Sequence, residues 1–293
     1  MKFLSHYFTP SEITYRILLI SDMHYSTEDR LGYTQKQRLD FMRDCILREH
    51  AERPIDALIL PGDLSIQDYP WRQLECDFSE KLMREYIAPL PFPSYVLPGN
   101  HDSYPDELWQ NLIGQPRQHA VVLNGCLFLL LDTFHGIAQS ASGAPYTGVD
   151  TAWARTQMET YPDLPVFLVA HYFKTEAESE EFFALVRHPR VVCMIMGHTH
   201  QADAYCAGSA CANKLIVDTG AFSYITRPTE GKWDFNVFHK RWAWGYNLLD
   251  FTADTAYIYH RFPEFHYHGV NMDYHMEGHI EDFCRLSLPP ELD

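Results

Sequence analysis

The sequence predicts an α/β fold in which buried strands alternate with helices. Short apolar runs without polar alternation, such as residues 17–20 and 57–60, are typical of strands that are buried on both faces. A helical segment separates these two runs, and the order of strand, helix and strand indicates a right-handed parallel crossover. Farther along the chain, Asn124-Gly125 lies between two apolar runs and predicts a β-hairpin. We therefore expect parallel and antiparallel strands together.

The first part of the chain is expected to form three buried strands, each followed by a helix. The strands are predicted at residues 15–21, 56–60 and 94–97. The helices are predicted at residues 34–52, 70–87 and 105–113. Thr34 is a favourable N-cap for the first helix, and Pro54 ends it.

The second part of the chain is expected to add antiparallel strands. The strands are predicted at residues 119–123, 126–131, 166–169, 191–196, 214–218, 245–251 and 256–262. The last three of these fit a second sheet that antiparallel strands close. One helix is expected at residues 150–160, and another begins at Thr175, because Thr175-Glu-Ala-Glu178 matches a capping box. Residues 135–148, rich in Gly, Ala and Ser, are expected to form an irregular loop and a lid over the site.

The composition is that of a folded protein with a substantial core, because 46% of the residues are hydrophobic and 14% are aromatic. No apolar run approaches the ~18 residues that a membrane-spanning helix needs. The first residues lack the apolar core and cleavage site of a signal peptide. We therefore expect a cytoplasmic protein without a membrane partner. The seven cysteines are odd in number and scattered, so no disulfide framework is expected.

The formal charge of −16 argues against an extended nucleic acid as a partner, because affinity for phosphate backbones comes mainly from Lys and Arg. A small phosphorylated substrate is compatible with this acidic chain if bound metal ions reverse the local field. The sequence does not determine the oligomeric state, so a homo-oligomer stays open.

Five of the predicted strands end in residue types that bind metal ions. The residues at these ends are Asp22-Met-His24, Gly62-Asp63, Gly99-Asn-His-Asp102, His171 and Gly197-His-Thr-His200. Ligands collect beyond the carboxyl ends of strands in sheets of this kind, so the five ends are expected to converge. Carboxylates and imidazoles together suit transition metals. The pattern D-x-H alone is common by chance, so the prediction depends on the whole set.

The order of these motifs, D-x-H, G-D, G-N-H-D, H and G-H-x-H, resembles the calcineurin-like metallophosphoesterase family over about residues 16–218. The resemblance implies a four-layer α-β-β-α sandwich, in which two mixed β-sheets pack face to face with helices outside. It also implies two catalytic metal ions, whose identity is open among Mn, Fe, Zn and Ni. This domain would cover residues 1–262, followed by a C-terminal extension at 263–293.

The family pattern, carried over position by position, distributes seven ligands over two ions. Asp22, His24, Asp63 and His200 would surround the first ion, and Asp63, Asn100, His171 and His198 the second. The shared Asp63 would hold the ions ~3.5–4 Å apart. A structural zinc would instead fill four ligands and leave no open position. Seven ligand residues therefore favour a catalytic centre, and a metal-free relic of the fold is the other interpretation.

His101 matches the family histidine that is not a ligand, and it would protonate the leaving group as general acid. Asp102 would accept a hydrogen bond from the other ring nitrogen and favour the charged imidazole, although a carboxylate here also suits a turn. The implied reaction is an in-line attack of a metal-bridging hydroxide on phosphorus.

The compact motifs resemble the bacterial branch that contains class III cyclic nucleotide phosphodiesterases and glycerophosphodiesterases. His171 is followed by Tyr172-Phe173, where the cyclic nucleotide enzymes usually carry His-Pro. We predict hydrolysis of a small-molecule phosphodiester of the cyclic nucleotide type. A phosphomonoesterase, or a pyrophosphatase acting on a nucleotide or lipid, is the second hypothesis. A catalytically inactive binding protein that keeps the fold is the third.

Other residues near the motifs carry weaker predictions. Candidates for substrate contact, each also compatible with a place in the core or rim, are Tyr25, Tyr69, Tyr104 and Tyr172. The C-terminal extension contains His266, His268, His275 and His279. These histidines are candidates for another metal site, for an interface arm or for a flap near the pocket.

Overall fold

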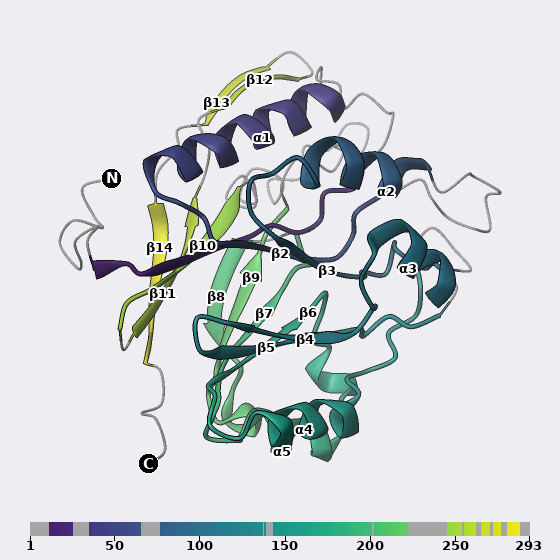
Figure 1. Ribbon diagram of the computed structural model, residues 1–293, viewed down its shortest axis with the longest axis vertical. Coiled ribbons are helices and arrows are strands. Elements are labelled where there is room, and N and C mark those ends of the chain that lie inside the picture. Colours follow the sequence, from purple (N-terminus) through teal and green to yellow (C-terminus); the bar gives the residue numbers. More distant parts are fainter. Residues whose placement is uncertain are drawn as a thin grey trace.

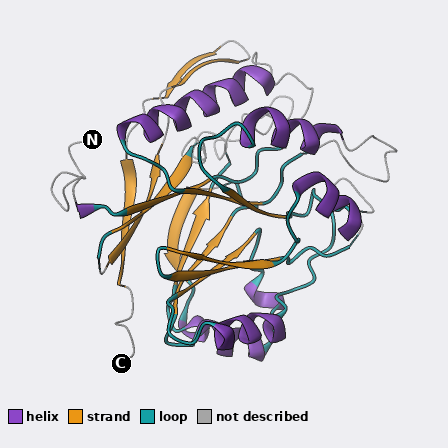
Figure 2. Ribbon diagram, viewed as in Figure 1, coloured by secondary structure: helices purple, strands orange, loops and turns teal. Residues whose placement is uncertain are grey.

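Two six-stranded β-sheets pack face to face at the centre of the structure (Figure 1). The structure is a computed structural model, and it describes residues 12–25, 35–65, 77–136, 138, 143–200, 202–221, 245–253, 255–261, 265–269, 272–276 and 280–287. Helices cover the outer side of each sheet, as Figure 2 shows. The predicted four-layer α-β-β-α sandwich is therefore confirmed.

The first sheet has the strand order β14-β11-β10-β1-β2-β3. Its strands are β1 (Tyr15–Leu19), β2 (Ala57–Pro61), β3 (Ser94–Leu97), β10 (Tyr246–Phe251), β11 (Thr255–Arg261) and β14 (Ile280–Ser287). The first three strands are parallel neighbours, as predicted, and the other three pair antiparallel. The boundary at residue 262 stays a prediction, and β14 brings part of the segment beyond it to the edge of this sheet.

The strands β10 and β11 belong to the first sheet, so our expectation that they complete the second sheet is wrong. β10 pairs with the outer edge of β1, and in this register Arg16 lies opposite Asp250. Arg16 Nε and Nη2 donate to the two carboxylate oxygens of Asp250 at 2.6 and 2.7 Å. Both residues are buried, and a buried charge is costly without its partner. This ion pair therefore favours the position of β10 beside β1.

The second sheet has the order β4-β5-β6-β7-β9-β8. Its strands are β4 (His119–Leu123), β5 (Cys126–Leu131), β6 (Val166–Ala170), β7 (Val191–Met196), β8 (Ala202–Cys206) and β9 (Leu215–Thr219). The hairpin indicated that the strands turn antiparallel from here on, but four neighbours, β5, β6, β7 and β9, are parallel, so the sheet is mixed, as the family resemblance implies. For two of the three parallel pairs a helical connection explains this: α4 lies between β5 and β6 and α5 between β6 and β7, and a crossover through a helix returns the chain in the same direction. The edge strand β8 was not predicted, because its sequence ADAYC has little apolar alternation.

The hairpin between β4 and β5 is confirmed. Asn124 and Gly125 have φ values of 48° and 71°, and the flanking residues Leu123 and Cys126 are paired. Both central residues of a type I′ turn need a positive φ, and Asn-Gly is the sequence that tolerates this best.

Helices enclose the two sheets from opposite sides (Figure 2). Those over the first sheet are α1 (Gln35–Glu52), α2 (Asp77–Leu82), which continues as a π-helix (Met83–Ile87), and α3 (Asp106–Ile113). Those over the second sheet are α4 (Thr151–Thr160) and α5 (Glu180–Val186). Thr34, Tyr69 and the predicted start of the second helix lie outside the described residues. Among the described helices, none combines the length and apolar character that crossing a membrane requires.

The capping box predicted at Thr175 is wrong. Residues Thr175–Ala177 form a single 3-10 turn, and α5 begins after Ser179, whose side chain accepts a hydrogen bond from the Phe182 N–H. Glu178 was the expected reciprocal partner, but its carboxylate accepts a hydrogen bond from the Tyr146 hydroxyl in a neighbouring loop. A tertiary contact has therefore replaced the local one.

We expect Ser179→Ala to lower the free energy of unfolding by about 1 kcal/mol, because it removes the N-cap of α5. Thr175→Ala is the matched control, and its effect should stay within about 0.5 kcal/mol. Urea unfolding followed by circular dichroism measures both values. A larger loss for Thr175→Ala than for Ser179→Ala would contradict the cap seen in the structure.

Candidate metal centre

The structure brings together the seven predicted ligand residues from the ends of five strands. The first sheet supplies Asp22 and His24 after β1, Asp63 after β2 and Asn100 after β3. The second sheet supplies His171 after β6, and His198 and His200 after β7. Six of them, together with His101, supply three overlapping groups of donor atoms, and the atoms of each group lie within 4.8 Å of one another.

The first donor group consists of Asp22, His24 and His200. His200 Nε2 lies 3.2 Å from Asp22 Oδ1 and 2.9 Å from His24 Nε2. Asp22 and His24 are buried, whereas 24% of the His200 side chain is exposed. One carboxylate and two imidazoles that meet in this way form a set suited to a transition metal, with one side open to solvent.

The second donor group consists of Asn100, His171 and His198. The amide oxygen Oδ1 of Asn100 lies 3.0 Å from His171 Nε2 and 2.9 Å from His198 Nδ1. The two imidazole nitrogens are 3.2 Å apart. This group mixes a neutral oxygen donor with two nitrogen donors.

Asp63 lies between the two groups. Its Oδ2 is 3.5 Å from His24 Nε2 and 3.2 Å from His171 Nε2. Its Oδ1 accepts a hydrogen bond from the His101 N–H at 2.9 Å. Because Oδ1 is engaged by the backbone, Oδ2 is the oxygen that faces both donor groups, as a bridging ligand must.

The carboxylate of Asp22 fits a bound cation. Its Oδ2 accepts hydrogen bonds from the Ser21 hydroxyl at 2.6 Å and from the His198 N–H at 2.9 Å. Its Oδ1 is buried and has no hydrogen-bond donor among the described residues. A buried carboxylate oxygen without a donor is unfavourable unless a further group neutralises it. The neighbouring imidazole nitrogens indicate that this group is a metal ion.

Burial and neighbouring charges together set the charge states of the centre. It lowers the pKa of His24 to about 4 and that of His198 to about 4, so both rings are neutral near pH 7. Burial alone would raise the pKa values of Asp22 and Asp63, but neighbouring imidazoles hold both below the usual range. Ionised carboxylates and neutral imidazoles are the forms that bind metals.

His171 is the exception among these imidazoles. Burial would lower its pKa, but the charge of Asp63 outweighs burial and raises the pKa to about 10. The carbonyl oxygen of Pro61 accepts a hydrogen bond from His171 Nδ1 at 2.7 Å. This bond fixes the ring, so Nε2 is the nitrogen that faces Asp63 and Asn100.

Five of the predicted ligands have a left-handed backbone. The φ values are 54° for Asp22, 43° for His24, 56° for Asp63, 73° for His198 and 58° for His200. Positive φ is uncommon for residues other than glycine, and backbone strain of this kind clusters at functional sites.

Two glycines of the motifs are required because a carboxylate oxygen lies where a larger residue would place its Cβ atom. A Cβ atom at Gly99 would lie 2.2 Å from Asp63 Oδ1, and one at Gly197 would lie 2.5 Å from Asp22 Oδ2. Real contacts are not this short, so any larger residue would displace the carboxylate of a predicted ligand.

His101 lies at the edge of the centre. Its Nε2 is 3.9 Å from Asp63 Oδ2, farther than the nearest nitrogens of His24 and His171. Its ring packs edge-to-face on His24, with 5.1 Å between the ring centroids. The side chain is 14% exposed, whereas His24 and His171 are buried. His101 is thus close enough to form a third donor group with His24 and Asp63, yet it stays open to solvent.

Asp102 does not make the predicted hydrogen bond to the His101 ring. It is fully buried, and its carboxylate accepts from the Leu64 N–H at 3.0 Å and from the Gly99 N–H at 2.9 Å. Burial, followed by the charge of Asp63, raises the pKa of Asp102 to about 7. The Asp102 carboxylate therefore links the loop after β2 to the loop after β3, because it accepts hydrogen bonds from backbone N–H groups of both loops.

The described tyrosines take different places. Tyr104 is 2% exposed and its hydroxyl is hydrogen-bonded to Ser79, so it belongs to the core and offers no surface for the predicted substrate contact. Tyr25 is half-buried and packs against the core between α2 and the first sheet. Tyr172 is half-buried, with its ring centroid 4.6 Å from that of His198.

Phe134 is a residue of the centre that the sequence interpretation missed. Its buried ring lies 5.6 Å from the ring of His171 and 5.6 Å from that of His198. Together with Tyr172, it encloses the imidazoles of the second donor group. Phe134 follows β5, which also ends in polar residues, Asp132 and Thr133. The polar residues at the end of this sixth strand could have indicated from the sequence that the residues after β5 lie near the centre.

The loop expected at residues 135–148 reaches the centre. Its described residues contain no helix or strand, and the Ala144 N–H donates to the Asn100 carbonyl oxygen at 2.7 Å. The predicted lid function stays a prediction.

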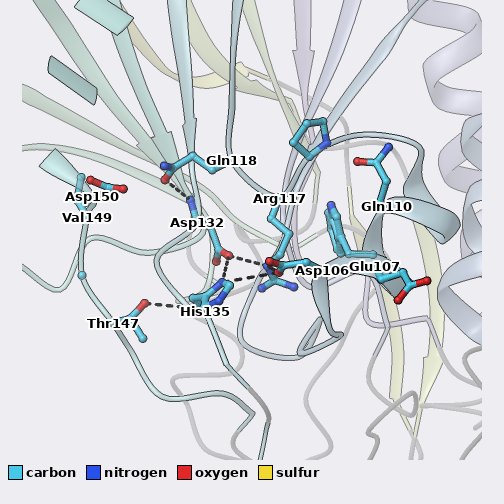
Figure 3. A pocket seen from close by; sticks show the side chains of 13 residues that line it. Asp106, Glu107, Gln110, Arg117, Gln118, Asp132, His135, Thr147, Val149 and Asp150 are labelled. Atoms are coloured by element: carbon cyan, nitrogen blue, oxygen red, sulfur yellow. Dashed lines mark hydrogen bonds and ion pairs between the residues drawn. The ribbon is translucent and has the colours of Figure 1, made fainter. Parts of the chain in front are cut away.

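A pocket of about 710 Å³ lies between α3 and the segments that follow β5 (Figure 3). None of the seven predicted ligands lines it. Arg117 Nε donates to Asp132 Oδ2 at 2.7 Å, and Arg117 Nη1 donates to the Tyr104 carbonyl oxygen at 2.9 Å. The pocket is therefore separate from the donor groups. Arg117 still connects the two regions, because its Nη1 also donates to the carbonyl oxygen of Asp102, the residue after His101, at 3.4 Å.

A protein-family model matches the part of the chain that contains the predicted metal ligands. The model described as calcineurin-like phosphoesterase matches residues 15–202 of this chain. This range contains all five motifs and therefore all seven predicted ligands.

Two curated relatives are phosphodiesterases by name. A probable glycerophosphodiester phosphodiesterase GpdQ from Arcobacter nitrofigilis is 24% identical over 227 residues, covering 70% of this chain and 77% of the relative. A 3',5'-cyclic-nucleotide phosphodiesterase from Nostoc sp. is 25% identical over 167 residues, covering 52% of this chain and 59% of the relative.

Solved structures share the fold at low sequence identity. A dimetal phosphatase from Danio rerio has a TM-score of 0.63 at 12% identity, covering 94% of this chain and all of that chain. A purple acid phosphatase from yellow lupin has a TM-score of 0.53 at 13% identity, covering 86% of this chain and 52% of that chain. Because the family model covers well over half of the sequence, this chain belongs to the calcineurin-like phosphoesterases, metal-dependent enzymes that hydrolyse phosphoric esters.

Proposed function

We propose that the two donor groups hold two divalent or transition metal ions that share Asp63. Asp22, His24, Asp63 and His200 would bind the first ion, and Asp63, Asn100, His171 and His198 the second. The observation that carries this proposal is the position of Asp63 Oδ2, which lies 3.5 Å from His24 Nε2 and 3.2 Å from His171 Nε2. A single oxygen between two nitrogen-containing groups supports a bridging role.

Different residues of this chain would have different roles in catalysis. Bound ions of this type lower the pKa of a water nucleophile and stabilise charge on phosphoryl oxygens. His101 would protonate the departing oxygen, because it lies beside Asp63, is partly exposed to solvent and is not one of the seven proposed ligands. Asp102 would position His101 through the backbone, since it holds the Gly99 and Leu64 N–H groups on either side. Tyr172 would hold the His198 ring in place.

We further propose that the substrate is a small-molecule phosphodiester of the cyclic nucleotide type. The two curated relatives, a glycerophosphodiester and a cyclic nucleotide phosphodiesterase, support a diester substrate. Hydrolysis of phosphomonoesters, or of the pyrophosphate bond of a nucleotide or lipid, is the alternative activity. The dimetal and purple acid phosphatases share only the fold, so they do not favour this alternative.

A comparison of two chromogenic substrates tests the diester proposal. We expect the metal-loaded protein to hydrolyse bis(4-nitrophenyl) phosphate at least about tenfold faster, in kcat/KM, than 4-nitrophenyl phosphate, a difference of about 1.4 kcal/mol in transition-state binding. The same preparation should then be assayed on cyclic nucleotides and on glycerophosphodiesters. A faster reaction with the monoester would favour the alternative activity.

Metal uptake should release a proton from His171. Near pH 7.5 the metal-free ring is protonated, because Asp63 raises its pKa to about 10, and a ligand nitrogen must be neutral. Metal affinity should therefore rise with pH up to about pH 10. Calorimetric titration with Zn²⁺ in PIPES and in HEPES measures the proton release, because the two buffers differ in ionisation enthalpy. Equal heats in both buffers would contradict the proposed state of His171.

A further inference from the structure

A buried ion pair between Arg117 and Asp132 lies beside the metal centre. Arg117 precedes β4 and Asp132 follows β5, so the pair closes the open end of this hairpin. Arg117 Nε donates to Asp132 Oδ2 at 2.7 Å, and each of the two side chains is 6% exposed. Asp106 Oδ1 lies 3.8 Å from the same nitrogen, but this side chain is 73% exposed. Asp132 is therefore the main partner, because charges attract more strongly away from water.

The guanidinium of Arg117 also holds the turn that carries His101. Its Nη1 donates to the carbonyl oxygens of Asp102 and Tyr104, at 3.4 and 2.9 Å. Its Cζ lies 5.5 Å from the centre of the Trp109 ring in α3. A guanidinium is a rigid planar fork that can meet several acceptors at once. Arg117 therefore fixes the backbone that directly follows His101.

The carboxylate of Asp132 reaches the other side of the centre. Its Oδ1 accepts a hydrogen bond from the Phe134 N–H at 3.1 Å. The Phe134 ring in turn lies 5.6 Å from the ring of His171 and 5.6 Å from that of His198. The ion pair thus connects the backbone around His101 with a ring that packs on two of the predicted ligands.

A change at Arg117 should move His101 more than the predicted ligand Asn100. The carbonyl oxygen of Asn100 accepts a hydrogen bond from the Ala144 N–H at 2.7 Å, on a loop that Arg117 does not hold. The Asn100 side chain lies among the imidazoles of the second donor group. His101 instead lies at the edge of the centre, where its side chain is 14% exposed.

We propose that Arg117 is a positioning residue for the general-acid step. Through the backbone of the turn, it sets the place from which His101 protonates the leaving group, and Asp132 keeps the guanidinium in position. This inference rests on the proposed role of His101. A general acid must lie within about 2.6–3.2 Å of the atom it protonates. A displacement of about 1 Å can cost a factor of about 10² in rate.

Arg117→Ala in the metal-loaded protein is expected to slow only reactions that need the acid. With an alkyl phosphodiester such as cyclic AMP, kcat should fall by about 10- to 100-fold. KM should stay near the wild-type value, because Arg117 acts on His101 and not on the substrate. With bis(4-nitrophenyl) phosphate, whose leaving group departs without a proton, kcat should change little. The metal content, measured by mass spectrometry, should equal that of wild type.

Guanidinium ions should restore the reaction of Arg117→Ala with the alkyl phosphodiester. Arg117 and Asp132 both line the pocket of about 710 Å³ (Figure 3), so the truncated side chain leaves a space that a small cation can reach. Guanidinium would be added at concentrations too low to unfold the protein. Urea has the same planar shape without the charge, and it should not restore the rate. A rate that guanidinium does not raise would count against the proposal.

Arg117→Lys is a milder change that keeps a positive charge opposite Asp132. Lysine lacks the planar fork, so it cannot hold the carboxylate and both carbonyl oxygens in the same way. We expect a smaller loss of kcat than in Arg117→Ala, again confined to the alkyl phosphodiester. This variant tests the proposal even if the alanine variant does not fold.

The matched control is Arg190→Ala. Arg190 is also buried, and it donates at 2.7 to 2.9 Å to the carbonyl oxygens of Met158, Tyr161 and Leu164. It precedes β7, whereas the predicted ligands His198 and His200 follow this strand. Arg190→Ala should lower the stability of the fold, and the ratio of the rates on the two substrates should stay as in wild type.

The comparison of leaving groups decides the outcome. An equal loss on both substrates in Arg117→Ala and Arg117→Lys would overturn the positioning role. If His101→Ala showed a dependence on the leaving group and the Arg117 variants did not, this inference would fail and the acid role of His101 would stand. If the variants at both residues showed no such dependence, the acid role itself would fail.

Discussion

Asp63→Asn is expected to abolish metal retention and turnover together. Asparagine keeps the shape of the side chain, and its amide oxygen can still accept the hydrogen bond from the His101 N–H. It removes the negative charge between the two donor groups, where cations at ~3.5–4 Å would repel each other. We therefore expect the metal content of the catalytic centre to fall below one equivalent and hydrolysis of bis(4-nitrophenyl) phosphate to fall to background.

The control for this variant is Asp44→Asn, which changes an exposed carboxylate on α1. It should leave the metal content and the rate unchanged. Circular dichroism should show that both variants keep the fold. An Asp63→Asn protein that retained two ions and full activity would rule out the bridging role.

His101→Ala is expected to lower kcat for a phosphodiester with an alkyl leaving group by about 10²- to 10⁴-fold, while the metal content stays at the wild-type value. The reason is that His101 lies 3.9 Å from the bridging carboxylate and is open to solvent, as a proton donor to a leaving group must be. The loss should depend on the leaving group. It should be small for 4-nitrophenolate, which departs without a proton, and large for an alkyl alcohol.

Metal analysis separates this role from ligation. His101 belongs to a donor group with His24 and Asp63, so a ligand role is the competing explanation. A parallel loss of metal and activity in His101→Ala would support ligation, and a loss independent of the leaving group would reject the acid role. His188→Ala, which changes a histidine outside the centre, should behave as wild type in both measurements.

The strand ends could be predicted from the sequence because the signal is local. Each apolar run stops at a polar motif, and parallel strands bring their carboxyl ends to one edge. Asp22, Asp63 and His171 therefore lie where the order of elements indicates. The helix spans of α3 and α4 and the turn at Asn124-Gly125 follow local rules in the same way.

Contacts that depend on the tertiary structure could not be predicted from the sequence. The place of β10 depends on the pair of Arg16 with Asp250, which are 234 residues apart in the chain. The Glu178 carboxylate does not cap a helix but accepts a hydrogen bond from a tyrosine 32 residues away. Asp102 prefers backbone donors of two loops over the adjacent ring of His101. In each case, local patterns allow several partners, and burial decides among them.

The division of the ligands between the two sheets has a consequence for how the protein is made. Asp22, His24, Asp63 and Asn100 come from the first sheet, and His171, His198 and His200 come from the second. A chain leaving the ribosome carries at most four of the seven donors until the second half has been translated. Under the proposed assignment, the full donor set exists only after His200 has been translated, and a product that ends before this residue would lack an intact centre.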